Sequence, residues 1–183
     1  MAGVDGGVEL TAYLVNESRA RRPELARDSL AGHWIPAGER NQVRALWEEY
    51  ARSVYPHDDL VCSLRGRAIL DTLAGLLRRE PDTVLLACGA GFTSYPWLLP
   101  FPAAIEADLP RVIDAKRRRL AELVATGVVE PRPVDLLPVD LADPAARERL
   151  VERVRAVAAG RPVAYVAEGL IFYLPDRHAR AVA

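Results

Sequence analysis

The sequence has few of the residues that build metal centres or disulfide frameworks. Its 183 residues contain two cysteines, Cys62 and Cys88, and three histidines, His33, His57 and His178. The cysteines are far apart and lie in apolar stretches, so we expect two reduced, packed thiols, which suits a cytoplasmic protein. The histidines lack the spacing typical of a metal site and lie in no known motif. We therefore expect neither a metal ion nor a histidine base.

Strong charge and long apolar runs are also missing. The formal net charge is −1, which indicates neither a nucleic-acid nor a membrane partner. No apolar run approaches the roughly 18 residues of a membrane span, and the first ten residues do not resemble a signal peptide. Lysine occurs once, at Lys116, and we expect the basic run 116–119 to be a solvated helix face.

What remains is an ordinary globular composition with two kinds of pattern. Residues 1–78 are rich in apolar positions at helical spacing, in the segments 8–22, 37–55 and 63–79. From residue 79 onward, short apolar runs alternate with helical patterns. The predicted strands lie at 83–88, 103–108, 133–141 and 162–170, and the predicted helices at 110–127, 143–160 and from Asp176. Pro110 and Asp143 are typical helix starts, and Gly127 and Gly160 are typical stops.

This alternation predicts an α/β fold with an open parallel sheet of about four strands, preceded by a helical cap. We predict two parts, the N-terminal helical cap at 1–78 and the sheet domain at 79–183. In such sheets a ligand binds beyond the carboxyl ends of the strands.

Each predicted strand ends in a glycine turn or an acidic residue. Gly89 and Gly91 follow the first strand, and Asp108, Asp140 and Glu168 follow the next three. The glycines would let the backbone approach a ligand, although a plain structural turn is the alternative. Asp108 lies at a spacing typical of an acid that binds ribose hydroxyls, with a helix cap as the alternative. Glu168 lies between apolar runs, so we expect it to be largely buried and to need a partner.

The glycine turn discriminates between two nucleotide-like cofactors. A nicotinamide dinucleotide uses a third glycine and a helix N-terminus for its pyrophosphate. Here Ser94 occupies the place of that glycine, and Pro96 interrupts the start of any helix. S-adenosylmethionine has no phosphate. It requires acidic side chains to bind its ribose and its ammonium group, and a basic side chain to bind its carboxylate. The sequence therefore favours S-adenosylmethionine.

Several motifs in order resemble one enzyme family. "TAYLVNESRARRPEL", "LRGRAILD", "GAGFTSYPWLL", "EADLPRVIDAKRRRL", "PVDLADP" and "AEGLIFYLP" are similar to segments of the leucine carboxyl methyltransferase family, including its bacterial polyketide-type O-methyltransferase branch. The resemblance covers nearly the whole chain. It implies a class I methyltransferase Rossmann-like sheet that binds S-adenosylmethionine.

The resemblance also implies roles for individual residues. Gly89 and Gly91 would line the methionine and ribose, and Asp108 would hold the ribose hydroxyls. Asp140 and Leu141 would flank the adenine, and Glu168 would face the methionine portion. Arg67, with Arg65 as second choice, would bind the methionine carboxylate, which suits a bidentate guanidinium.

The sequence departs from the family in two places. Thr93, Ser94 and Tyr95 replace the family's usual Asp-Thr-Arg run. The family's sheet also has seven strands, whereas we predict four. We therefore expect an exposed hydrophobic edge at the fourth strand, which would pair with another copy or with a complementing chain.

The resulting prediction is an S-adenosylmethionine-dependent O-methyltransferase. Its acceptor would be a carboxylate or a hydroxyl of a small molecule or natural product, such as an intermediate of polyketide biosynthesis. A hydroxyl would need a general base and a carboxylate would not; the sequence does not identify a catalytic residue. The alternative is a module that binds the cofactor or a partner without turnover.

Overall fold

The computed structural model describes residues 8–170, which begin with a group of helices. The three predicted long helices are present, and two single-turn helices that the sequence patterns did not predict lie between them. In chain order these helices are α1 (Val8–Arg21), α2 (Pro23–Ala26), α3 (Ala31–Trp34), α4 (Arg40–Ser53) and α5 (Asp58–Arg79). The boundary near residue 78 between cap and sheet domain stays a prediction.

All four predicted strands form, and they pair in parallel. They are β1 (Val84–Cys88), β2 (Ala104–Asp108), β3 (Val134–Pro138) and β4 (Val163–Val166). Their order in the described sheet is β3-β2-β1-β4. Both the second and the fourth strand thus pair with the first, and strand order reverses beside β1. This confirms the predicted α/β class with a Rossmann-like parallel sheet.

The connections follow the predicted start and stop signals, with one exception. Between β2 and β3, α7 (Pro110–Ala125) begins at the predicted proline. Between β3 and β4, α8 (Pro144–Ala158) is capped by Asp143, whose carboxylate accepts the Ala145 N–H at 3.0 Å. The prediction that Pro96 prevents a helix after the glycine turn was wrong. A single turn, α6 (Tyr95–Leu98), forms there, because a proline in the first helical turn displaces no intrahelical hydrogen bond.

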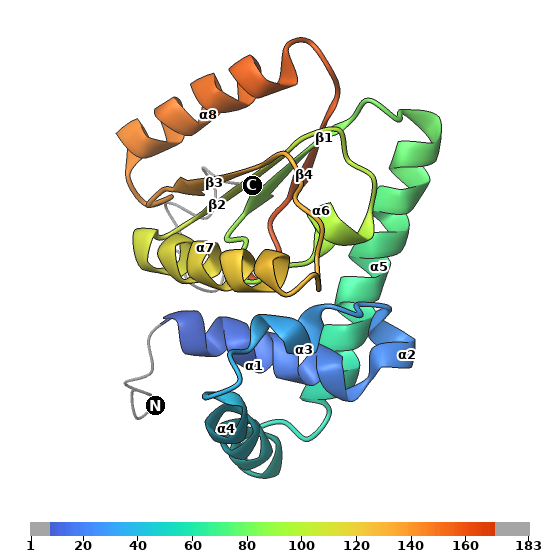
Figure 1. Ribbon diagram of the computed structural model, residues 1–183, viewed down its shortest axis with the longest axis vertical. Helices are drawn as coiled ribbons and strands as arrows, with labels where there is room; N and C mark the ends of the chain where they lie inside the picture. The colour runs from blue at the N-terminus through green and yellow to red at the C-terminus, as the bar shows by residue number, and fades with distance from the viewer. Residues whose placement is uncertain (1–7, 171–183) are drawn as a thin grey trace.

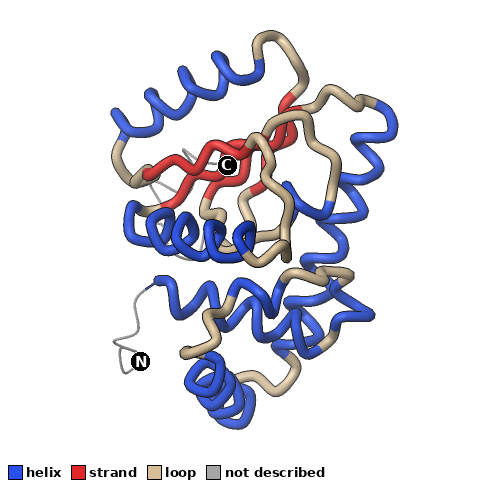
Figure 2. Tube along the Cα trace, viewed as in Figure 1, coloured by secondary structure: helices blue, strands red, loops and turns tan. Residues whose placement is uncertain are grey.

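Helices cover both faces of the sheet (Figures 1 and 2). On one face α8 packs on Ile105 and Cys88 through residues such as Leu150. On the other face α5 packs on Leu85 through residues such as Leu73. The helix α7 lies on this same face of the sheet (Figure 1). The helices α1, α3 and α4 share a separate apolar cluster with α7 and with the turn after β1; its buried members are Tyr13, Trp34, Ile35, Val43, Phe92, Leu123 and Val129.

The strand β4 lies at one edge of the described sheet. Ala164 and Val166 are buried, whereas Val163 and Tyr165 are 40% and 44% exposed. One face of this strand is therefore partly exposed, and its position at an edge of the described sheet agrees with the prediction. The helix predicted from Asp176 lies outside the described residues.

Candidate functional site

The turn after β1 needs its two glycines. Gly89 and Gly91 have φ angles of +64° and +48°, which favour glycine because other residues place Cβ in steric conflict. A Cβ on Gly89 would lie 2.9 Å from the Leu170 side chain, and one on Gly91 would lie 3.3 Å from Cβ of Ala12. The turn therefore brings bare backbone against the N-terminal helix and against the segment after β4.

Asp108 joins this turn to the end of β2. Its Oδ2 accepts the Gly91 N–H at 2.7 Å, and its Oδ1 accepts the Leu109 N–H at 2.7 Å. Burial raises the pKa of Asp108, and these two N–H groups oppose the rise. Because each carboxylate oxygen accepts more than one hydrogen bond, the two contacts leave acceptor capacity for a ligand hydroxyl. The alternative role as a helix cap was wrong, because α7 has Leu109 at its N-cap and no side-chain cap hydrogen bond. The ribose-binding role stays a prediction.

Glu168, directly beyond β4, is the centre of a buried polar cluster. Its side chain is 5% exposed. Arg19 binds it through NH2, Arg65 donates to it through Nε at 2.8 Å, and the Tyr95 hydroxyl donates to it at 2.6 Å. Burial alone would raise the pKa of Glu168, but these three donors outweigh it and lower the pKa to about 2. The expected buried carboxylate with partners is confirmed, and it is ionised at neutral pH.

The guanidiniums at this cluster only partly match the prediction. Arg65, the second choice, takes part in it, whereas Arg67, the first choice, donates to Asp71 at 2.6 Å on the outer side of α5. The described cavity lining includes Arg65 and not Arg67. Arg19 was not predicted, although it continues the helical spacing of Thr11 and Val15, which line the same cavity. That spacing was the available signal for it.

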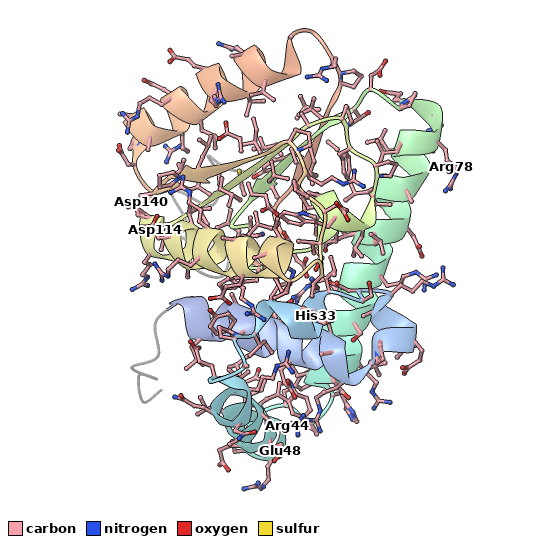
Figure 3. All side chains as sticks on the ribbon, viewed as in Figure 1. His33, Arg44, Glu48, Arg78, Asp114 and Asp140 are labelled. Carbon is pink, nitrogen blue, oxygen red and sulfur yellow. The ribbon has the colours of Figure 1, made fainter. Side chains whose placement is uncertain are left out.

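The segment after β3 supplies the last two predicted residues. Asp140 is exposed and accepts the Ala142 N–H at 2.9 Å, and Leu141 is buried and packs towards α8. Figure 3 shows Asp140 at the end of the sheet where α7 begins. This position agrees with the hydrogen bond from the Val139 N–H to the Asp108 carbonyl at 2.8 Å.

These groups meet in one cavity of about 590 Å³, within the usual size of ligand pockets. Seven of the eight predicted residues line it: Arg65, Gly89, Gly91, Asp108, Asp140, Leu141 and Glu168. The opposite wall comes from α1, α4 and α5. Asn16 and Arg19 on α1 both line the cavity, and the Asn16 Oδ1 and Arg19 Nε are buried without a hydrogen-bond partner in the described structure.

A second buried pair lies beneath the glycine turn. Lys116 Nζ is 2.7 Å from Glu106 Oε2, and both side chains are fully buried. Lys116 also donates to the Thr93 carbonyl at 3.1 Å. The expectation that residues 116–119 form a solvated face was wrong for Lys116, because α7 turns this side chain towards the sheet. Burial lowers the pKa of Lys116 and raises that of Glu106.

The three residues that depart from the family pattern are all held by buried acids. The Thr93 hydroxyl donates to Glu106, the Ser94 hydroxyl to Asp28 and the Tyr95 hydroxyl to Glu168, at 2.9, 3.0 and 2.6 Å. Ser94 also accepts the Trp34 indole N–H at 3.0 Å. The replacement run is therefore anchored to the N-terminal helices, to β2 and to the segment after β4, and it fixes the end of the turn that faces the cavity.

Two further classes of site are absent from the described residues. Between residues 8 and 170 no cluster of three or more histidine, cysteine or acidic side chains could hold a metal ion. No helix in this range is both long and apolar enough to cross a membrane.

Comparison with known proteins gives consistent similarities. The profile of the leucine carboxyl methyltransferase family matches residues 8–183. A relative in Mycobacterium ulcerans is 38% identical over 92% of this chain and 58% of its own length. One in Mycolicibacterium smegmatis is 37% identical over 64% of this chain and 34% of its own length. Both are provisionally named S-adenosyl-L-methionine-dependent methyltransferases. The chain thus spans between about a third and three fifths of the length of these two relatives.

Proposed function

Because the chain belongs to the leucine carboxyl methyltransferase family, we propose that it binds S-adenosylmethionine and that the protein transfers the cofactor's methyl group to an oxygen atom of a small molecule. Two relatives carry names that specify this cofactor. The proposal rests mainly on one observation, the meeting of Arg19, Arg65 and Glu168 with the glycine turn and Asp108 in one cavity.

The donor set of the cavity suits the two ends of this cofactor. An amino-acid zwitterion needs a cation for its carboxylate and an anion for its ammonium group. Arg19 and Arg65 supply guanidiniums, and Glu168 is an ionised acceptor.

The other end of the cofactor is a nucleoside. Asp108 would accept its ribose hydroxyls. The hydrogen bond from the Gly91 N–H, which fixes one of its carboxylate oxygens at the cavity wall, supports this role. The exposed Asp140 and the buried Leu141 offer a polar and an apolar surface for the adenine.

In this arrangement the protein would act mainly by positioning. Bound S-adenosylmethionine supplies an electrophilic methyl group on a sulfonium. Arg19, Arg65 and Glu168 would fix its amino-acid end and Asp108 its ribose, so that an acceptor oxygen meets the methyl group in a defined orientation. Such proximity can supply several kcal/mol of rate acceleration.

Calorimetry with S-adenosylhomocysteine and with NAD tests the cofactor. We expect heat from the first and none from the second. The substitution Asp108→Asn should weaken S-adenosylhomocysteine binding by about 1.5–3 kcal/mol, the usual contribution of a hydrogen bond to a charged group. An analogue without ribose hydroxyls should bind wild type and Asp108→Asn equally, and Asp114→Asn on the exposed face of α7 should bind like wild type. NAD binding without any S-adenosylhomocysteine binding would refute the proposal.

A further inference from the structure

The cavity has a helical wall for which no role follows from cofactor binding alone. It includes Leu14 and Val15 of α1, Tyr50 of α4, and Asp58 and Cys62 of α5. In the described lining, Asp58 is the one carboxylate that these three helices contribute. This wall is therefore mostly apolar, with a single negative charge.

Asp58 shares one face of α5 with Cys62 and Arg65, because residues four and seven apart lie in line on a helix. The Cys62 Sγ is 3.7 Å from both carboxylate oxygens of Asp58 and 3.8 Å from NH2 of Arg65. Arg65 in turn binds Glu168. A continuous row of contacts thus connects Asp58 to the position proposed for the amino-acid end of the cofactor.

Hydrogen bonds with residues of α1 and α4 hold the Asp58 side chain in place. The buried Ser18 hydroxyl lies 2.6 Å from Asp58 Oδ2, and the Trp47 indole N–H donates to the same Ser18 oxygen at 2.7 Å. Asp58 is half-buried, and its side-chain hydrogen-bond partners in the described structure, Ser18 and Cys62, are uncharged. Its orientation is therefore fixed without neutralisation of its charge.

The charges of the cavity indicate which acceptor this wall accommodates. Its described lining holds two cations, Arg19 and Arg65, and the proposed function assigns both to the amino-acid end of the cofactor. A carboxylate acceptor would thus meet the negative charge of Asp58 without a cation of its own. Burial and the adjacent Asp58 raise the pKa of the Cys62 thiol to about 11, so this thiol stays neutral. A neutral hydroxyl, in contrast, can donate a hydrogen bond to Asp58.

We propose that Asp58 binds the methyl acceptor, that the acceptor is an apolar or aromatic molecule with a neutral hydroxyl, and that Asp58 accepts its proton. This inference rests on the proposed function. As the acceptor oxygen forms its bond to the methyl carbon, the carbon–sulfur bond breaks and its electron pair stays on sulfur, which becomes a neutral thioether. The hydroxyl proton moves to Asp58.

A matched pair of aromatic probes tests the binding half. In protein saturated with S-adenosylhomocysteine, naphthol should bind more tightly than naphthoate. The substitution Asp58→Asn keeps an oxygen for Ser18 but removes the charge. It should weaken naphthol binding about 10- to 100-fold, the range for a hydrogen bond to a charged group, and strengthen naphthoate binding. Asp71→Asn, on the outer side of the same helix, should change neither.

Radiolabelled methyl transfer tests the proton acceptor. With naphthol as acceptor, Asp58→Asn should lose about 100-fold or more of the rate, as expected for loss of a general base. With nitrophenol above its pKa, where the hydroxyl is already ionised, the same substitution should not slow the reaction. Equal losses with both acceptors would refute proton transfer to Asp58.

The two proposals fail in different ways. If S-adenosylhomocysteine does not bind, the proposed function is wrong. If S-adenosylhomocysteine binds wild type and Asp58→Asn equally, the cofactor assignment stands. In that case any of three results refutes the role of Asp58: naphthoate binds better than naphthol, neither probe binds, or Asp58→Asn weakens the binding of both probes alike.

Discussion

Neutralising Glu168 should reveal how strongly the site is held together before any ligand binds. In Glu168→Gln the amide can still accept from Tyr95, but the buried guanidinium of Arg19, 2% exposed, loses its main anionic partner. Only Asp28, at 3.8 Å, remains as a counter-ion within the described residues. A buried charge that loses its partner is strongly destabilising.

The magnitude follows from the pKa of Glu168. It falls from 4.5 to about 2, and each unit corresponds to about 1.36 kcal/mol. Ionised Glu168 therefore contributes ~3 kcal/mol to the free energy of unfolding at neutral pH. Because the folded-state pKa lies below the unfolded value, this contribution is complete above pH 4.5 and is lost as the pH falls towards about 2.

Urea unfolding at a series of pH values, followed by circular dichroism, measures this contribution. At neutral pH Glu168→Gln should be ~3 kcal/mol less stable than wild type, and the two should converge in acid. The control Asp114→Asn removes an exposed ion pair with Arg117 and should cost at most about 1 kcal/mol. A difference between Glu168→Gln and wild type that is independent of pH would refute the reasoning.

Two further predictions concern the sheet. Lys116→Met leaves Glu106 buried without its cation and should lower the free energy of unfolding by about 3–5 kcal/mol. Urea unfolding should show that adding Glu106→Gln restores most of the loss. A double variant as unstable as the single variant would contradict this prediction. At the edge strand, exposed Val163 and Tyr165 should promote association. Light scattering over a concentration series should detect it, and Tyr165→Lys should reduce it; a wild-type chain that stays monomeric at high concentration would contradict this.

The sequence by itself determined the four strands, the long helices and the residues that follow each strand. Strands, helix starts and helix stops depend on local signals, such as Pro110, Asp143 and the positive-φ Gly127. In a parallel sheet the carboxyl ends of strands meet at one edge. The residues that follow them, such as Asp108 and Glu168, could therefore be assigned to one site before the structure was known.

Only the tertiary structure decided which charged side chains enter that site. Arg65 and Arg67 are two residues apart on one helix and hence point about 200° apart, so the choice between them depends on which face of α5 meets the cavity. Arg19 reaches Glu168 across 149 positions of sequence.

Only the tertiary structure also decided the position of Lys116. The basic run 116–119 predicted that this side chain is exposed, whereas the packing of α7 brings it against Glu106. Such pairings depend on how helices orient against the sheet. Packing against distant segments sets that orientation, and no local sequence pattern records it.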